Sequence, residues 1–267
     1  MDSSKKTYKS HIQLSKVLLR PYQEKNTNDD TYYVNLLNLQ DCTFQRKKLN
    51  EIDCDKGEYF NQTVEDFLAK EIESKINTEI DKAREAIESS QKHNNSFTMT
   101  DLKFFRSLFK YYYIRNVDYY NLFLEKSITS KILSNITHSN LFGFDKSIDK
   151  HFAGKKIGFI INKTSVGFVC PHNVIYYVFS EIQNTFFLVI TLKKELAIYI
   201  DISQSSNNID VIEIYENENV YMLNLAAYYT EKNHTNPYVV GRKVELERLL
   251  FVIQNKPTQS GFIKVNF

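Results

Sequence analysis

The chain has 267 residues, 42% of them hydrophobic, which is enough for one large domain or two small ones with a sizeable core. Its 34 basic and 32 acidic residues leave a net charge of +2, and this balance argues against a general polyanion-binding protein. The cysteines form no Cys-x-x-Cys pair, which argues against a disulfide framework and a thiolate zinc site.

The chain carries no sign of export or of a membrane span. The first residues carry charge with no apolar stretch behind them, so the sequence predicts no signal peptide. The longest apolar run, residues 186–192, is too short to cross a bilayer. We therefore expect a cytoplasmic protein that does not contact membranes.

The N-terminal half is expected to be mainly helical, with one β-hairpin. Residues 32–37 and 43–47 are rich in aromatic and β-branched side chains, which predicts two strands joined by a turn. Apolar residues recur every three or four positions over 63–89, which predicts an amphipathic helix. An aromatic-rich helix is expected over 101–127 and a third helical piece over 127–139.

After residue 145 the pattern changes to strands. Hairpins are predicted at 157–170 and 186–200, a further strand at 211–215, and two closing helices at 217–232 and 243–254. These elements favour an α+β fold with a helical N-terminal half and an antiparallel, β-rich C-terminal half. The soft boundary divides the chain into regions 1–144 and 145–267, which we expect to share one core.

The first candidate catalytic pair lies near the N-terminus. His11 can act as a general acid or base, and the Arg20 guanidinium can hold a phosphate. Phosphodiester cleavage uses such a pair of groups. The alternative is an N-terminal segment docked by ion pairs and hydrogen bonds. A short helix that includes both residues is expected to end at Pro21.

Two arginines lie on the aromatic helix. Arg106 and Arg115 are nine residues apart, so they point to opposite faces of the helix and cannot share one site. Either guanidinium can clamp a phosphate or carboxylate between aromatic rings. The alternative is an arginine that pairs with a core acid or stacks on tyrosine.

A possible metal site lies in the polar link before the strands. Asp145, Asp149 and His151 form a D-x-x-x-D-x-H pattern whose carboxylates suit magnesium or manganese, and a solvated loop is the alternative. No glycine-rich phosphate loop, G-x-S-x-G elbow or H-E-x-x-H motif occurs in the chain. The sequence therefore predicts no cofactor, and a metal ion only if the protein is a nuclease.

The order of these pieces resembles the bacterial domain of unknown function 4238 family. The resemblance is carried by His11, by the Leu-Arg-Pro-Tyr segment at 19–22, by the hairpin and the two long helices, and by Asn224 in a late helix. Where the family shows Asp-Asn-Pro and Pro-Leu-Ser, this chain reads Asn-Lys-Thr at 162–164 and Thr-Leu-Lys at 191–193.

Relatives of that family occur among mobile elements and phage-defence islands, so the resemblance implies a part in conflict between bacteria and phages. We favour an interaction or sensor protein that binds a protein partner, because the family's polar motifs are replaced here. The alternative is an effector nuclease acting on DNA or RNA through His11, Arg20 and Arg115. A third hypothesis is a small-ligand site lined by Asn162 and Asn224, with Arg106 as a further ligand-binding candidate. A homo-oligomer is compatible with each.

Overall fold

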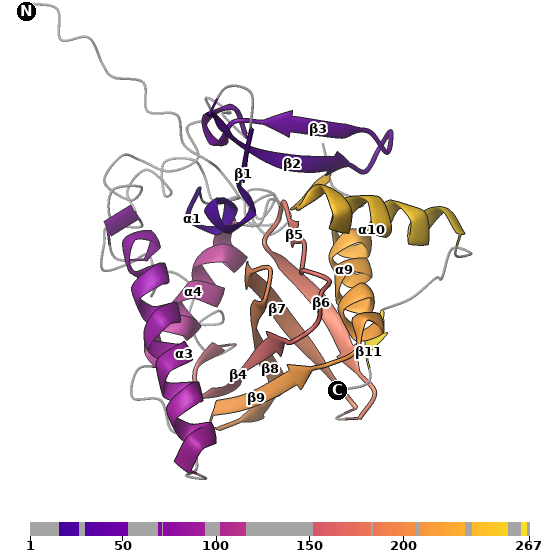
Figure 1. Cartoon of the computed structure of the whole chain (residues 1–267). Coiled ribbons are helices and arrows are strands. Elements are labelled where there is room, and N and C mark those ends of the chain that lie inside the picture. The colour runs from indigo at the N-terminus through magenta and orange to yellow at the C-terminus, as the bar shows by residue number, and fades with distance from the viewer. Residues whose placement is uncertain are drawn as a thin grey trace, which may run out of the picture.

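A computed structural model shows two β-sheets and five α-helices among the residues that it describes (Figure 1). These residues are 16–26, 30–52, 69–70, 72–93, 102–115, 152–182, 184–206, 209–232, 237–255 and 263–265. Within these ranges no helix is long and apolar enough to span a bilayer.

The larger sheet has six strands in the order β11-β6-β7-β8-β4-β9. Neighbours from β6 to β4 are antiparallel, whereas β9 runs parallel to β4 and β11 runs parallel to β6. The strands are β4 (Lys155–Asn162), β6 (Ile175–Ser180), β7 (Thr185–Lys193), β8 (Leu196–Ser205), β9 (Ile209–Ile214) and β11 (Lys264–Val265).

The smaller sheet joins the two ends of the sequence. Its central strand β2 pairs antiparallel with β1, β3 and β10, and β10 pairs in turn with β5. The strands are β1 (Glu24–Lys25), β2 (Tyr32–Asn38), β3 (Phe44–Lys47), β5 (Cys170–Pro171) and β10 (Tyr238–Gly241).

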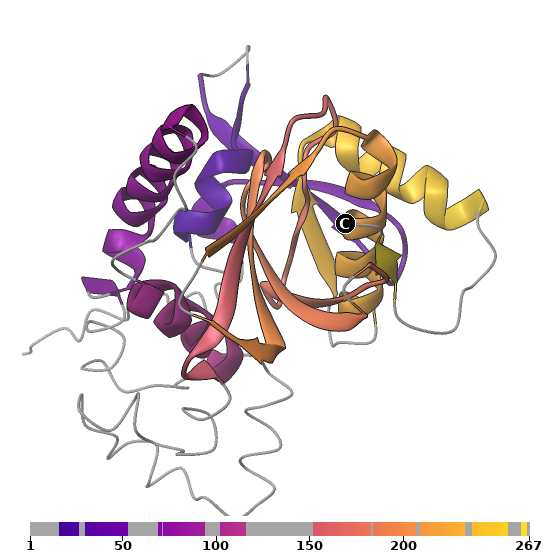
Figure 2. The ribbon, with the colours of Figure 1, turned by 90° about the horizontal axis from the view of Figure 1, so that it is seen from below.

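Helices cover both faces of the larger sheet: α3 and α4 lie on one side, and α9 and α10 on the other (Figure 2). The α-helices are α1 (Lys16–Leu19), α3 (Ile76–His93), α4 (Leu102–Arg115), α9 (Asn217–Glu231) and α10 (Lys243–Asn255). Short 3-10 helices are η1 (Arg20–Tyr22), η2 (Leu49–Glu51) and η3 (Glu73–Lys75).

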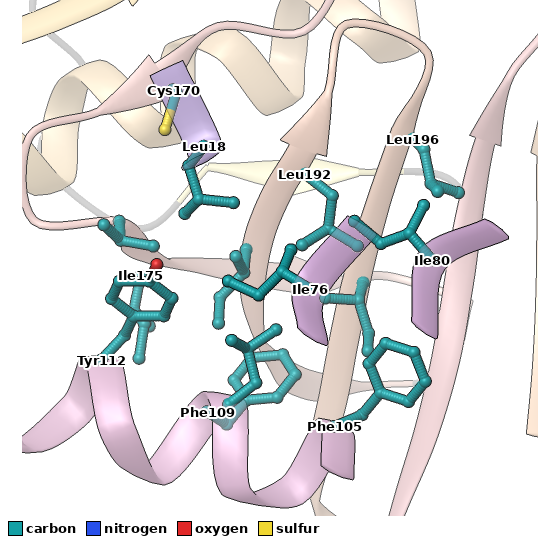
Figure 3. Close-up of a cluster of buried hydrophobic side chains, with 14 of the residues drawn as sticks. Leu18, Ile76, Ile80, Phe105, Phe109, Tyr112, Cys170, Ile175, Leu192 and Leu196 are labelled. Carbon is teal, nitrogen blue, oxygen red and sulfur yellow. The ribbon is translucent and has the colours of Figure 1, made fainter. Parts of the chain in front are cut away.

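The helical patterns explain how the first hydrophobic cluster forms. The apolar stripe of α3 and the aromatic side of α4 meet one face of the sheet, where their side chains are buried (Figure 3). Phe105 contacts Phe159 of β4 edge to face, with ring centroids 5.3 Å apart. The second cluster lies on the opposite face and includes Ile160, the next residue of β4, together with Leu223 of α9.

Three strands of the larger sheet are tied together at Gly158. This glycine of β4 pairs with Tyr199 of β8 on one side and with Asp210 of β9 on the other. The Tyr199 ring lies across the glycine, and its hydroxyl donates a 2.8 Å hydrogen bond to Asp210. Lys156 forms an ion pair with the same carboxylate. These hydrogen bonds hold the pKa of Asp210 below its ordinary value, although burial acts in the opposite direction.

The expected fold class is wrong in two respects. The N-terminal half is not shown to be helical, because much of it lies outside the described residues, including the helical piece expected over 127–139. Its hairpin is present, but β2 lies between β3 and the C-terminal strand β10. The larger sheet is mixed, because two of its pairings are parallel. Periodicity cannot show that residue 36 pairs with residue 240, so a sequence-based division into a helical half and a sheet half misses this pairing. The division near residue 145 stays a prediction.

The expected hairpin at 157–170 is also wrong. Strand β4 is present, but it pairs with β8 and β9. Residues 163–169 form an irregular segment in place of a returning strand.

Candidate functional site

The hairpin of β2 and β3 presents a group of aromatic and basic side chains, and polar contacts hold its tip. The backbone N–H of Gln40 donates to Asn38 Oδ1 over 2.8 Å. Asp41 Oδ1 accepts hydrogen bonds from the hydroxyl and the backbone N–H of Thr43, at 2.7 and 3.1 Å, and these bonds lower the Asp41 pKa. Cys42 takes the left-handed conformation, with φ of 56°. The start of β3 is therefore fixed.

The hydrogen-bonding directions along β2 follow from two observed bonds. Asn38 N donates to Thr43 O on the β3 side, and Leu39 N donates to Pro237 O on the β10 side. Because bonding alternates along an antiparallel strand, even-numbered residues of β2 bond to β3 and odd-numbered residues bond to β10. On β3, the backbones of Gln45 and Lys47 therefore face β2, and those of Phe44 and Arg46 face outward.

We call this surface the basic edge and define it as Tyr32, Tyr33, Phe44, Arg46, Lys47 and Lys48. Tyr32 is 53% exposed and Phe44 is 42% exposed. Within the described ranges β3 pairs with β2 alone, and in Figure 1 it forms the outer rim of the molecule. The basic edge thus combines open backbone groups with aromatic and cationic side chains.

The basic side chains are arranged on an aromatic ring. The Arg46 guanidinium lies 4.8 Å from the centroid of the Tyr33 ring, and the Lys48 ammonium lies 5.8 Å from the same centroid. Among the described residues, no carboxylate forms an ion pair with Arg46, Lys47 or Lys48. Arg46 and Lys48 thus share one aromatic ring as a neighbour.

A rigid support lies behind this surface. Val34 and Leu36 are buried in the first hydrophobic cluster, and Leu37 is buried in the second. The amide of Asn35 donates to Glu24 Oε2 over 2.7 Å, which ties β2 to β1. Because β2 is fixed on both faces, β3 is presented without the ordering cost of a mobile loop.

A second group of polar side chains is buried at the turn between β5 and β6. Glu231 at the end of α9 accepts from the backbone N–H of Asn173 over 3.0 Å, and its other oxygen lies 3.5 Å from His172 Nδ1. The imidazole stacks on Tyr238, with centroids 4.3 Å apart. Val174 has φ of 65°, an unusual value for a β-branched residue.

This buried group resembles an imidazole oriented by a carboxylate, and the nucleophilic side chain nearest to His172 in sequence is Cys170. Cys170 is close in sequence, yet burial raises the pKa of its thiol, which keeps it protonated. Asn173 is 3% exposed, and its side-chain amide has no hydrogen-bond partner among the described residues. We therefore assign the group a role in joining α9 to the turn. Among the described residues, no three His, Cys, Asp or Glu side chains are placed to hold a metal ion.

Arg106 contacts backbone rather than a cavity. Its guanidinium donates to the carbonyl of Lys155 over 3.1 and 3.3 Å and to that of Ser206 over 3.2 Å. Partial burial lowers its pKa. These contacts attach α4 to the ends of β4 and β8, which favours a structural role over ligand binding.

Asn162 and Asn224 both support the irregular segment 163–169. The Asn162 amide donates to the carbonyls of Val166 and Lys194. The Asn224 amide bonds to both sides of the segment, because it accepts from Val169 N over 2.9 Å and donates to Gly167 O over 3.0 Å. Since each amide is occupied by backbone, this arrangement favours structural support over a ligand site.

Of the other predicted site residues, the structure describes only two. Arg20 is exposed in η1, and Arg115 is the last residue of α4, with a side chain outside the described part. The remaining candidates lie outside the described residues: His11, Asp145, Asp149 and His151. The nuclease hypothesis and its metal site therefore stay predictions.

Sequence reasoning identified the hairpin but missed its surface. The signal was present, because Phe44 and Arg46 alternate with Gln45 and Lys47 on a strand of predicted period two. Alternation alone does not reveal that β3 lies at the edge of the sheet, since this depends on which strands pair with β2.

Comparison of the chain with protein families, curated proteins and solved structures finds no match. The resemblance to the 4238 family therefore stays a prediction.

Proposed function

We propose that the protein acts by binding a protein partner through the basic edge. The observation that carries this proposal is the exposed strand β3, on which aromatic and cationic side chains sit on a rigid hairpin. Tyrosine and arginine are the residues most enriched at the energetic centres of protein interfaces. A setting in phage defence or mobile-element conflict rests on the family resemblance alone.

Quantitative affinity capture from a bacterial host compares the wild type with a Phe44→Ser/Arg46→Glu variant. Both side chains are exposed, so the variant is expected to keep its fold while losing the aromatic and cationic contacts. A matched control is Arg248→Glu/Phe251→Ser on α10, where Phe251 is 66% exposed. We expect a stoichiometric partner to be lost from the hairpin variant and retained by the control. Equal capture by all three proteins contradicts the proposal.

A further inference from the structure

We infer that the basic edge binds an acidic, extended segment of the partner, which adds to the smaller sheet as a strand beside β3. The inference rests on the proposed function and names the partner's chemistry. Exposed sheet edges bind extended peptides in this way, with main-chain bonds giving affinity and side-chain contacts giving selectivity.

The backbone supplies the first requirement. Phe44 and Arg46 direct their N–H and C=O groups away from β2, as the alternation fixed by the Asn38 and Leu39 bonds shows. Two residues spaced by two along a strand form a regular row of donors and acceptors. An incoming strand can therefore pair with β3 without disturbing the bonds that β3 already makes.

Charge selects an acidic segment. Residues 46–48 are Arg-Lys-Lys, and the nearest acids in the described part of the sequence, Asp41 and Glu51, accept hydrogen bonds from other groups. Asp41 accepts from Thr43, and Glu51 accepts from the backbone N–H of Lys48 over 3.0 Å. Cross-strand carboxylates opposite these cations are stabilising, whereas like charges are not.

The same charges argue against a second copy of the chain as the occupant. An antiparallel pair of β3 strands centred on Arg46 would place this guanidinium directly opposite the same group of the other copy. Basic residues on sheet edges generally prevent such self-association. The basic edge is therefore expected to repel a second copy of itself and to bind an acidic strand.

A peptide titration tests the charge requirement. The probe is a fluorescein-labelled peptide of four Glu-Val repeats, and the comparison peptide has four Lys-Val repeats. We expect the acidic peptide alone to bind, and Lys47→Glu/Lys48→Glu to weaken it by about tenfold, because two partly exposed pairs become repulsive. Equal binding of the basic peptide, or tighter binding of a single-stranded oligouridylate, overturns the inference.

Amide hydrogen exchange tests strand addition itself. In the free protein the amides of Gln45 and Lys47 are expected to exchange slowly, because they donate to β2, and those of Phe44 and Arg46 rapidly. The acidic peptide should slow exchange at Phe44 and Arg46 only. Unchanged exchange at both amides on a saturated complex contradicts pairing with β3.

A backbone variant separates main-chain pairing from charge. Arg46→Gln removes the charge alone, whereas Arg46→Pro also removes the outward N–H and is tolerated on an edge strand. We expect the proline variant to bind the acidic peptide about fivefold more weakly than the glutamine variant, the loss that one hydrogen bond represents. Equal affinities count against strand addition. Partner capture that depends on the hairpin, with no binding of the peptide, leaves the proposed function standing and removes this inference.

Discussion

Gly158 shows how one residue without a side chain allows three strands to be joined. The Tyr199 ring occupies the space that a Cβ would fill, and from there its hydroxyl reaches Asp210. Burial raises the pKa of the Tyr199 hydroxyl, so it remains a donor to the carboxylate. The glycine is therefore needed for close approach rather than for an unusual φ.

We predict that Gly158→Ala lowers the free energy of unfolding by about 3 kcal/mol, because the added methyl overlaps a ring that has no room to move. Urea unfolding followed by circular dichroism measures the loss. Gly154→Ala is the control, because its Cβ meets nothing within 4 Å and φ of 68° is its only cost. The double variant Gly158→Ala/Tyr199→Leu should be less destabilised than the sum of its single changes. Strict additivity would refute the steric explanation.

For the polar residues predicted to bind a ligand, the sequence alone does not show whether the partner is a ligand or the protein backbone. A buried asparagine or arginine is equally suited to a ligand and to a backbone carbonyl, because the same donors serve both. Asn224 lies in a helix that the sequence predicts, but its two partners come from residues 167 and 169. Those partners depend on tertiary packing, so no local pattern reveals them.

The strongly periodic helices are present, although the helix expected over 63–89 is an α-helix only from Ile76 to His93, with the 3-10 helix η3 before it. Ile76, Ile80 and Ile87 follow the helical stripe and are buried in α3, and the closing helices α9 and α10 lie within a residue or so of their expected limits. The turn between β2 and β3 also lies where Asn38 and Asp41 predict it.

The prediction of a strand within residues 163–169 is wrong for a physical reason. Val166, Phe168 and Val169 are apolar and buried, as in a strand, but no regular strand ladder forms. The N–H groups of Val166, Gly167 and Val169 donate to side chains, whereas that of Phe168 donates to the backbone carbonyl of Lys194. Glu245, itself buried, accepts from Gly167 N over 3.1 Å and also binds Arg242. A buried irregular segment and a buried, paired strand both require apolar residues, so composition does not distinguish them.

At the hairpin tip, substitutions of Cys42 are expected to raise or lower the free energy of unfolding, depending on the residue introduced. Because its φ of 56° favours glycine, Cys42→Gly is expected to raise the free energy of unfolding by about 0.5 kcal/mol, and Cys42→Val to lower it by about 1 kcal/mol. Thermal unfolding of the two variants checks these opposite signs. A loss of stability in the glycine variant would show that the thiol makes a compensating contact.

The whole molecule is organised around a sheet with a hydrophobic cluster on each face. Successive residues of β4 point to opposite clusters, Phe159 to the first and Ile160 to the second. Strand β4 contributes side chains to both clusters, so loss of packing in one cluster exposes a strand that also supports the other. We therefore expect the two faces to unfold together.

Truncation on either face tests this coupling. Phe105→Ala in the first cluster should cost about 4 kcal/mol and Leu223→Ala in the second about 3 kcal/mol, because both side chains are fully buried. Tyrosine fluorescence and circular dichroism in urea should give coincident transitions for both variants. A biphasic transition in either one would mean that the clusters are independent.

The pairing of β2 with β10 also determines when the molecule can be completed during synthesis. Asn35 leaves the ribosome long before its partner Gly241, with some two hundred residues between them. Until then the nascent chain must carry Val34, Leu36 and Leu37 without their final neighbours. Strand β2 is thus made well before the strand that completes its pairing, which makes it the natural client of a chaperone.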